Sequence, residues 1–181
     1  MQNNEFDNFD DELRSMQELM AKDDIAISDE SLQTSLRGLN LKPVIGVETG
    51  TSVKECVDKM LAHRIGCLVV IKDKKLVGIF TERDVLLKIA GENYDLTQKN
   101  VDQFMSPSPA YLSMDDSIKA ALKLMHDGGY RHIVIVNENQ EPQSVVSIKN
   151  IIDYIVEFFP QDVLNLPPHP IRFGTRHREG G

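Results

Sequence analysis

Apolar and polar positions follow the same pattern twice along the chain. Residues 52–71, SVKECVDKMLAHRIGCLVVI, align with residues 117–136, SIKAALKLMHDGGYRHIVIV, at a constant offset of 65 positions. After one inserted residue, VGIFTERDVL at 77–86 aligns with QSVVSIKNII at 143–152. Repetition at a fixed period indicates that one supersecondary unit has been duplicated. The sequence therefore predicts two similar units of about 65 residues each.

Each unit predicts the order β-α-β-β-α. A short extended segment, at 43–47 or 109–113, precedes a helix whose apolar residues recur at helical spacing. The continuous runs CLVVI and HIVIV predict strands that are buried on both faces, and LVGIF and SVVS predict the strands that follow them. A second helix is expected to begin near Glu82 in the first unit and near Ile148 in the second. The predicted fold class is α/β (α+β), built from a duplicated β-α-β-β-α unit.

The residues TERD, at 81–84, follow directly on a predicted strand. The pattern T-x-x-D is typical of a helix start, in which the Thr81 hydroxyl caps the first turn and Asp84 returns a hydrogen bond to the cap. The equivalent residues of the second unit are Ser147 and Asn150. The capping role leaves open whether Asp84 also holds a ligand.

The repeated segments resemble a tandem pair of cystathionine-β-synthase (CBS) domains of the stand-alone, bacterial type, often called a Bateman module. The resemblance rests on the duplicated unit, on Gly78, Thr81 and Asp84 in the pattern G-x-x-T-x-x-D, on MSPSP between the copies, and on YRHIVIV in the second copy. It covers residues 42–158. It implies two units packed sheet to sheet about a pseudo-twofold axis, with two clefts that commonly bind AMP, ADP, ATP or S-adenosylmethionine. It also implies a flat dimer that regulates an attached or partner protein and performs no chemistry.

The resemblance also implies which residues line the better cleft. Asp84 is expected to hold the ribose, because a carboxylate accepts strong hydrogen bonds from two adjacent hydroxyls. The helix start beside it offers free amide groups to a phosphate. Phosphates are expected against the second unit, and the adenine against Val44 and Ile45 in the PVI segment and near Ile65 and Gly66. The expected ligand-binding residues are Val44, Ile45, Ile65, Gly66, Gly78, Thr81, Asp84, Arg131, His132 and Lys149.

Each of these residues also has an ordinary structural explanation. Arg131 and Lys149 fit surface cations, and His132 fits a hydrogen-bonded core histidine. The ligand role is favoured because the residues occur together in the pattern of one family.

The mirror cleft is expected to be weaker, because an amide replaces the carboxylate and uncharged residues replace the phosphate-binding pair. Asn150 stands for Asp84, and Gly66 and Cys67 stand for Arg131 and His132. The residues expected in this second site are Arg83, Ser147 and Asn150. One strong adenine-nucleotide site per chain is therefore predicted.

Composition narrows the function classes. The net charge of −8 comes entirely from residues 1–30, which hold ten acidic and two basic residues, so the rest lacks the basic footprint of a nucleic-acid binder. The longest apolar runs are too short to span a membrane. Cys56 and Cys67 fit core residues, and no His, Cys, Asp and Glu cluster has metal-ligand spacing. No catalytic motif is present. A cytoplasmic protein without catalytic or metal site, cofactor or membrane contact is expected.

The ends of the chain differ from the repeated part. The expected organisation is an amphipathic helix and linker at 1–40, a first unit at 41–100, a second unit at 101–159 and a Pro/Gly/Arg tail at 160–181. An apolar stripe at helical spacing suits docking on the module itself, on a dimer mate or on a separate protein, and these alternatives stay open. The stripe consists of Phe6, Phe9, Leu13, Met16 and Met20.

Together these features predict a regulatory module that senses an adenine nucleotide and acts through a homodimer or an unknown protein target. The helix faces that carry Met60 and Met125 are expected to form the dimer. The alternative is a ligand-free adaptor that uses the repeated fold and the N-terminal helix for protein binding only. An enzyme is the weakest hypothesis, because neither cleft offers a nucleophile with a base.

Overall fold

The computed structural model describes residues 29–158 of the 181-residue chain. The first half holds α2 (Asp29–Leu32), the 3-10 turn η1 (Leu36–Gly38), β1 (Gly46–Glu48), α3 (Val53–His63), β2 (Cys67–Lys72), β3 (Lys75–Thr81) and α4 (Glu82–Lys88). The second half holds η2 (Val101–Gln103), β4 (Ser106–Pro107), β5 (Tyr111–Leu112), α5 (Ile118–Gly128), β6 (His132–Val136), β7 (Pro142–Ser147) and α6 (Ile148–Phe158). The apolar stripe and the tail predicted from the sequence lie outside the described residues.

The order β-α-β-β-α is confirmed in both units, as β1, α3, β2, β3, α4 and as β5, α5, β6, β7, α6. The helices α4 and α6 begin at Glu82 and Ile148, as expected. The strands β1 and β5 are shorter than predicted, because the residues just before them run along a strand of the other unit.

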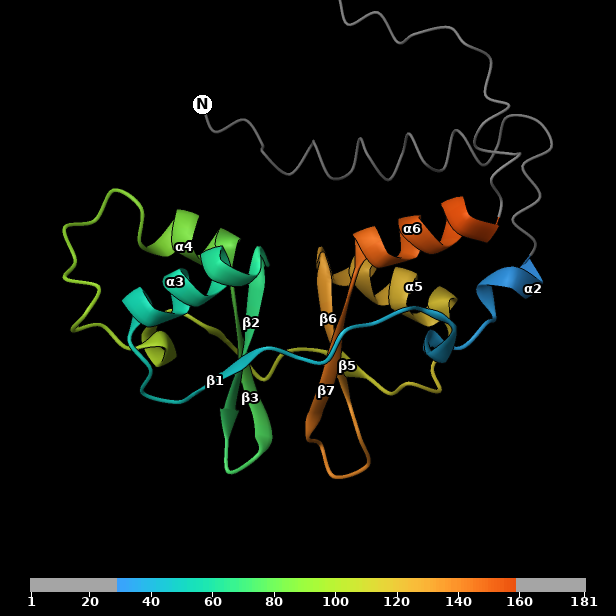
Figure 1. Cartoon of the computed structure of the whole chain (residues 1–181), viewed down its shortest axis with the longest axis horizontal. Helices are drawn as coiled ribbons and strands as arrows, with labels where there is room; N and C mark the ends of the chain where they lie inside the picture. Colours follow the sequence, from blue (N-terminus) through green and yellow to red (C-terminus); the bar gives the residue numbers. More distant parts are fainter. Residues whose placement is uncertain (1–28, 159–181) are drawn as a thin grey trace, which may run out of the picture.

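Two separate sheets carry the two units. In the first sheet, of order β1-β2-β3-β4, β1 is parallel to β2 and the other pairs are antiparallel. In the second, of order β5-β6-β7, β5 is parallel to β6 and β7 is antiparallel to it. The sheets face each other in the middle of the molecule, with α3 and α4 outside one and α5 and α6 outside the other (Figure 1). The expected sheet-to-sheet packing is confirmed.

The central strands are buried on both faces, which explains their continuous apolar character. In β2, Leu68 and Val70 pack into the core shared with α3, whereas Val69 points between the two sheets. Val134 and Val136 of β6 meet it there from the second unit. Alternate residues of each strand thus belong to two different cores.

Each unit completes its sheet with the segment that precedes the other unit. The strand β4 leads into the second unit but pairs with β3 of the first, with Gly78 opposite Pro107 and Ile79 opposite Ser106. In the same way Pro43, ahead of the first unit, pairs with Ser144 of β7. These leading segments cross between the units, and the sequence pattern did not predict the exchange.

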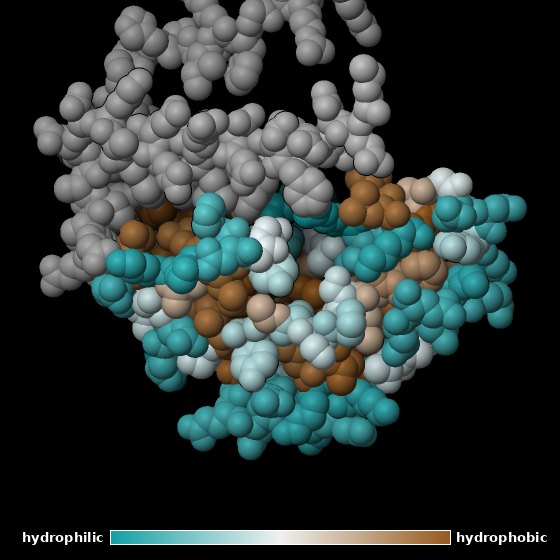
Figure 2. Space-filling model, turned by 180° about the vertical axis from the view of Figure 1, so that it is seen from behind, coloured by the Kyte–Doolittle hydropathy of each residue, from teal (hydrophilic) through white to brown (hydrophobic). Residues whose placement is uncertain are grey.

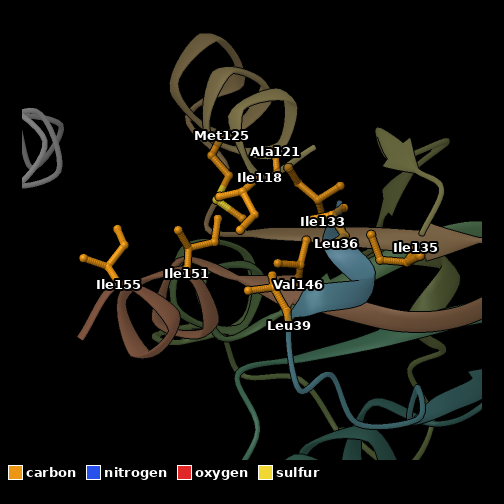
Figure 3. Packing of buried hydrophobic residues seen from close by; sticks show 10 residues of the cluster. All are labelled: Leu36, Leu39, Ile118, Ala121, Met125, Ile133, Ile135, Val146, Ile151 and Ile155. Carbon is orange, nitrogen blue, oxygen red and sulfur yellow. The ribbon is translucent and has the colours of Figure 1, made fainter. Parts of the chain in front are cut away.

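The exchange extends to the hydrophobic cores. Leu36 and Leu39 are buried among residues of the second unit (Figure 3), and their equivalents 65 positions on, Val101 and Phe104, are buried in the first. The repeat therefore reaches back to residue 36. The core of the second unit consists of Leu36, Leu39, Ile118, Ala121, Met125, Ile133, Ile135, Val146, Ile151 and Ile155.

The prediction that Met60 and Met125 lie on an exposed dimer face is wrong. Met60 and Met125 are almost completely buried, because they lie on the helix faces that pack against their own sheets. The outer helix surfaces carry other apolar side chains instead. Those exposed on α3, α4 and α6 are Leu61, Leu86, Leu87, Ile152, Val156 and Phe158.

Candidate functional site

The end of β3 and the start of α4 form the predicted capping box. The Thr81 hydroxyl accepts a hydrogen bond from the Asp84 backbone amide at 3.2 Å. The Asp84 Oδ2 atom accepts from the Thr81 amide at 2.9 Å and from the Thr81 hydroxyl at 2.7 Å. The prediction that this motif starts a helix is confirmed. Its effect is to fix the carboxylate of Asp84 at the end of an inner strand.

The second oxygen of Asp84 has a partner that the sequence analysis missed. The Lys88 ammonium lies 2.6 Å from Asp84 Oδ1, one helical turn along α4. It also donates a hydrogen bond of 2.6 Å to the carbonyl of Phe104. Asp84 is buried, so Lys88 both neutralises its charge and covers it. The i,i+4 spacing of the two residues was the available signal.

Gly78 makes room for a protein side chain in this structure. A Cβ atom at Gly78 would overlap Met105 Sδ. Met105 directly precedes β4, which pairs with β3 at Gly78. The close approach that glycine permits is therefore that of the leading segment, which carries Met105 over Gly78.

Val44 and Ile45 directly precede β1, which lies at the opposite edge of the first sheet from β4. The Val44 amide donates to the carbonyl of Gln143 in β7 at 3.0 Å, and the Ile45 carbonyl accepts from Val69 in β2. Val44 therefore contacts β7 of the second unit, whereas Ile45 contacts β2 of the first. The segment beside the Asp84 motif is the one at 105–108.

Gly66 lies under the first residue of α4. Its carbonyl accepts from the Glu82 amide at 2.9 Å, and a Cβ atom at Gly66 would come within 3.1 Å of the Glu82 carboxylate. Ile65 packs against the core of the first unit. The two residues thus support the start of α4 from within its own unit.

His132 is the first residue of β6, and Arg131 directly precedes it. Burial lowers the pKa of His132, the positive charge of Arg131 lowers it further, and the carboxylate of Glu82 opposes both effects. Because Glu82 belongs to the first unit, its effect on the pKa of His132 indicates that the start of α4 and the start of β6 lie near each other across the interface. These are the predicted ribose-binding and phosphate-binding elements.

Lys149 lies farther out on the surface. Its ammonium pairs with Asp153 at 2.6 Å along α6, and its side chain is 77% exposed. This ion pair is weak in water, so it does not fix the lysine in one position. The structure places Lys149 two residues into α6, as Arg83 is placed two residues into α4.

The second motif, formed by Ser147 and Asn150, makes the same hydrogen bonds as Thr81 and Asp84 but carries an amide in place of the carboxylate. Asn150 Oδ1 accepts from the Ser147 amide at 2.9 Å and from the Ser147 hydroxyl at 2.6 Å. Ser144, the counterpart of Gly78, donates to the carbonyl of Lys42 at 2.6 Å. Tyr154 stands one turn after Asn150, where the first unit has Lys88. The two motifs share the same capping hydrogen bonds and differ in charge.

A small hollow of about 170 Å³ lies at the other end of the sheets, away from both motifs. It is lined by Leu76, Ser108, Pro109, Tyr111, Val136 and Gln140. Seen from behind, hydrophobic residues gather over the middle of the molecule above a hydrophilic lower end (Figure 2).

The described residues 29–158 contain no group of three or more His, Cys, Asp and Glu side chains placed to hold a metal ion. Within the same range, no helix is long and apolar enough to cross a membrane. Cys56 and Cys67 are buried in the core, as expected, and burial raises the pKa of Cys56 to about 11 and that of Cys67 to about 12.

Comparison with known proteins identifies this arrangement. A family model described as CBS domain matches residues 36–91 and 101–157. A CBS domain-containing protein of Arabidopsis thaliana is 30% identical over 108 residues, which cover 60% of this chain and 20% of that protein. The chain thus spans only a fifth of that relative.

Two solved structures share the fold. A CBS-domain containing protein from Agrobacterium tumefaciens is 26% identical with a TM-score of 0.60, covering 67% of this chain and 98% of that one. A CBS domain protein from Pyrobaculum aerophilum, solved in complex with AMP, is 24% identical with a TM-score of 0.60, covering 65% and 89%.

Proposed function

The chain belongs to the CBS-domain family, and from that premise we propose that it is a regulatory module that senses AMP, ADP or ATP in the cleft beside Asp84. S-adenosylmethionine is a further candidate of the same adenosine class. The module would act on a protein target, through a dimer or directly, and would not catalyse a reaction.

The observation that carries the proposal is the fixed carboxylate of Asp84. Its Oδ2 atom is held by two hydrogen bonds from Thr81, so its orientation is set before any ligand arrives. A carboxylate in a fixed orientation suits the two adjacent hydroxyls of a ribose. Asn150 makes the same cap without a charge, so capping alone does not account for the acid at 84.

The second unit supplies the cations that the phosphates of such a ligand require. Arg131 and His132 stand opposite the start of α4, close enough for Glu82 to affect the pKa of His132. Lys149 is exposed and only weakly paired, so it is able to turn toward a phosphate. These residues make the cleft complementary to a nucleotide more than to a nucleoside.

The arrangement of the leading segments refines the expected base site. The segment at 105–108 borders β3 beside Gly78, and we place the adenine against it. Val44 borders β7 and Ile45 borders β2, and their contact with the adenine stays a prediction. The relative solved with AMP supports the fold, whereas the ligand class rests on the residues of this chain.

A screen of adenine ligands tests the proposal. The melting temperature of the full chain is measured with AMP, ADP, ATP and S-adenosylmethionine. A ligand at 100 times its dissociation constant should add about 2.7 kcal/mol to the free energy of unfolding, or about 5–11 °C for a chain of this size. Guanine and pyrimidine nucleotides serve as controls. No shift with any adenine ligand would reject the proposal.

A ligand-free adaptor is the second candidate, and one observation favours it. Apolar side chains such as Leu86, Leu87 and Val156 are exposed on α4 and α6, where a second copy or another protein would cover them. Light scattering of the purified chain decides whether a homodimer forms. An adaptor would bind its partner equally well with and without nucleotide.

A further inference from the structure

We infer that Lys88 is a latch on the proposed nucleotide site, which covers the ribose-binding carboxylate and ties it to the segment between the two units. The inference rests on the proposed function, and it names a regulatory contact that nucleotide binding has to open.

The geometry around Asp84 leaves little access for a ligand while Lys88 is in place. Asp84 Oδ2 is used by Thr81, and Asp84 Oδ1 lies 2.6 Å from the Lys88 ammonium. The carboxylate side chain is 9% exposed, whereas that of Lys88 is 42% exposed. A ribose therefore reaches the free side of Asp84 only when Lys88 swings outward. The four-carbon stem of lysine permits that movement.

Lys88 also joins two parts of the chain that are distant in sequence. Its ammonium donates to the carbonyl of Phe104 at 2.6 Å, while Phe104 itself is buried in the core of the first unit. The next residue, Met105, lies over Gly78, and β4 then pairs with β3. The latch thus connects the carboxylate to the segment at 104–108, which continues into the second unit.

Opening the latch removes one anchor of that segment. A nucleotide that displaces Lys88 from Asp84 also draws its ammonium away from the Phe104 carbonyl, because one group makes both contacts. The inferred consequence is that occupation of the cleft loosens the segment at 104–108. That change would pass from the nucleotide to the second unit through the backbone.

Two comparisons within the molecule separate the latch from an ordinary surface ion pair. On α5, Lys123 and Asp127 form an i,i+4 pair at 2.8 Å, but their side chains are 75% and 52% exposed. In the second unit the equivalent of Lys88 is Tyr154, whose hydroxyl lies 3.5 Å from Thr34 Oγ1. The latch therefore accompanies the cleft that has the carboxylate.

The test uses full-length variants and adenosine as the probe, because adenosine has a ribose but no phosphate that would be attracted to a lysine. Lys88→Met removes the charge and keeps the length of the side chain, and Lys88→Arg restores a cation. Lys123→Met is the matched control for the loss of one surface cation. Calorimetry gives the dissociation constant for adenosine. Hydrogen exchange without nucleotide reports on the amides of 104–108.

The expected result is that Lys88→Met binds adenosine about fivefold more tightly than the wild type, the equivalent of one ion pair. Lys88→Arg and Lys123→Met should bind as the wild type does. Amides at 104–108 should exchange faster in Lys88→Met and unchanged in Lys123→Met. Equal or weaker adenosine binding by Lys88→Met overturns the inference, while binding by the wild type still supports the proposed function.

A failure of the latch and a failure of the proposed function give different results. If neither wild type nor Lys88→Met binds adenosine or AMP, the proposed function fails, and the exchange experiment decides the latch alone. Unchanged exchange at 104–108 in Lys88→Met then rejects it. Binding by Lys88→Met with none by the wild type supports both the latch and the site.

Discussion

The two units end their third strand with the same hydrogen bonds but with different chemistry. Thr81 and Asp84 cap α4, and Ser147 and Asn150 cap α6, with corresponding contacts of 2.9 and 2.7 Å and of 2.9 and 2.6 Å. An amide oxygen therefore serves the cap as well as a carboxylate does. The cap therefore does not require the negative charge at 84, which pairs with Lys88 here and would hold a ribose in the proposed function.

The surroundings of the two motifs differ in the same direction. In the first unit a cation, Lys88, covers the carboxylate, whereas Tyr154 occupies that position in the second. The leading segments are also held differently, by Met105 over Gly78 in one sheet and by the Ser144 hydroxyl in the other. The first unit therefore carries the charged residues of the proposed binding site, and the second unit has the same hydrogen-bonded motif without them.

The largest expected effect tests the equivalence of the two cores. Leu36→Ala should lower the free energy of unfolding by about 2–5 kcal/mol, because it empties a fully buried position in the core of the second unit. Val101→Ala, at the equivalent position of the first core, should cost less because fewer atoms are removed. Urea denaturation measures both. A loss for Leu36→Ala below about 1 kcal/mol would mean that the leading segment is not part of the core.

The next prediction concerns a substitution that gives the Thr81–Asp84 motif the amide of the Ser147–Asn150 motif. Asp84→Asn should weaken AMP binding about five- to hundredfold, because the ribose loses a charged acceptor worth roughly 1–3 kcal/mol. The cap should survive, since Asn150 already makes it. Calorimetry measures the affinity, and the melting temperature without nucleotide checks the fold.

Asn150→Asp is the matched control for that experiment. It gives the second motif a carboxylate, but Gly66 and Cys67 stand there in place of Arg131 and His132. The number of AMP molecules bound per chain should therefore stay at one. Full AMP affinity in Asp84→Asn, or two equal sites in the wild type, would contradict the asymmetry between the clefts.

Much of this comparison could be predicted from the sequence, because it depends on local patterns. The capping residues predicted the starts of α4 and α6, and the apolar runs predicted β6 at its observed bounds and β2 one residue short. The sheet-to-sheet packing came from the family resemblance, and the carboxylate against amide difference was visible in the alignment of the two units.

The exchanged segments could not be predicted in the same way. The strand β4 has two residues, and its pairing with β3 depends on tertiary contacts rather than on any periodicity. A signal for the core residues existed, since Leu36 and Leu39 repeat as Val101 and Phe104 at the common offset. The spacing of Lys88 from Asp84 was an available signal for their ion pair. Its hydrogen bond to the Phe104 carbonyl could not be predicted, because it depends on tertiary structure.

A smaller loss of stability is expected where each leading segment contacts its sheet, at Gly78 in the first unit and at Ser144 in the second. Gly78→Ala should cost about 1–2 kcal/mol of unfolding free energy, because the added methyl overlaps Met105 and the leading segment has to shift. Adding Met105→Ala should recover part of the loss, since it removes the overlapping atoms. The control is Ser144→Ala, which removes one hydrogen bond to Lys42 and should cost about 1 kcal/mol. Denaturant unfolding of the three variants measures these differences, and no recovery in the double variant would show that Met105 is not the obstacle.

The smallest expected effect is the pH dependence of the free energy of unfolding. It concerns His132, the first residue of β6, which corresponds to Cys67 in β2. Burial and the charge of Arg131 hold the pKa of His132 below its ordinary value, against the opposing effect of Glu82. As the pH falls through about 6.5, the unfolded chain gains a proton at His132 that the folded chain does not. Stability should therefore decrease from about pH 7.5 to about pH 5.5, with a slope no steeper than one proton allows.

His132→Cys copies the first unit, where burial raises the pKa of Cys67 to about 12, so that the thiol does not titrate in this range. Urea unfolding of both proteins across this range should show a flatter pH dependence for the variant, and identical slopes would mean that His132 titrates alike in the folded and unfolded chain.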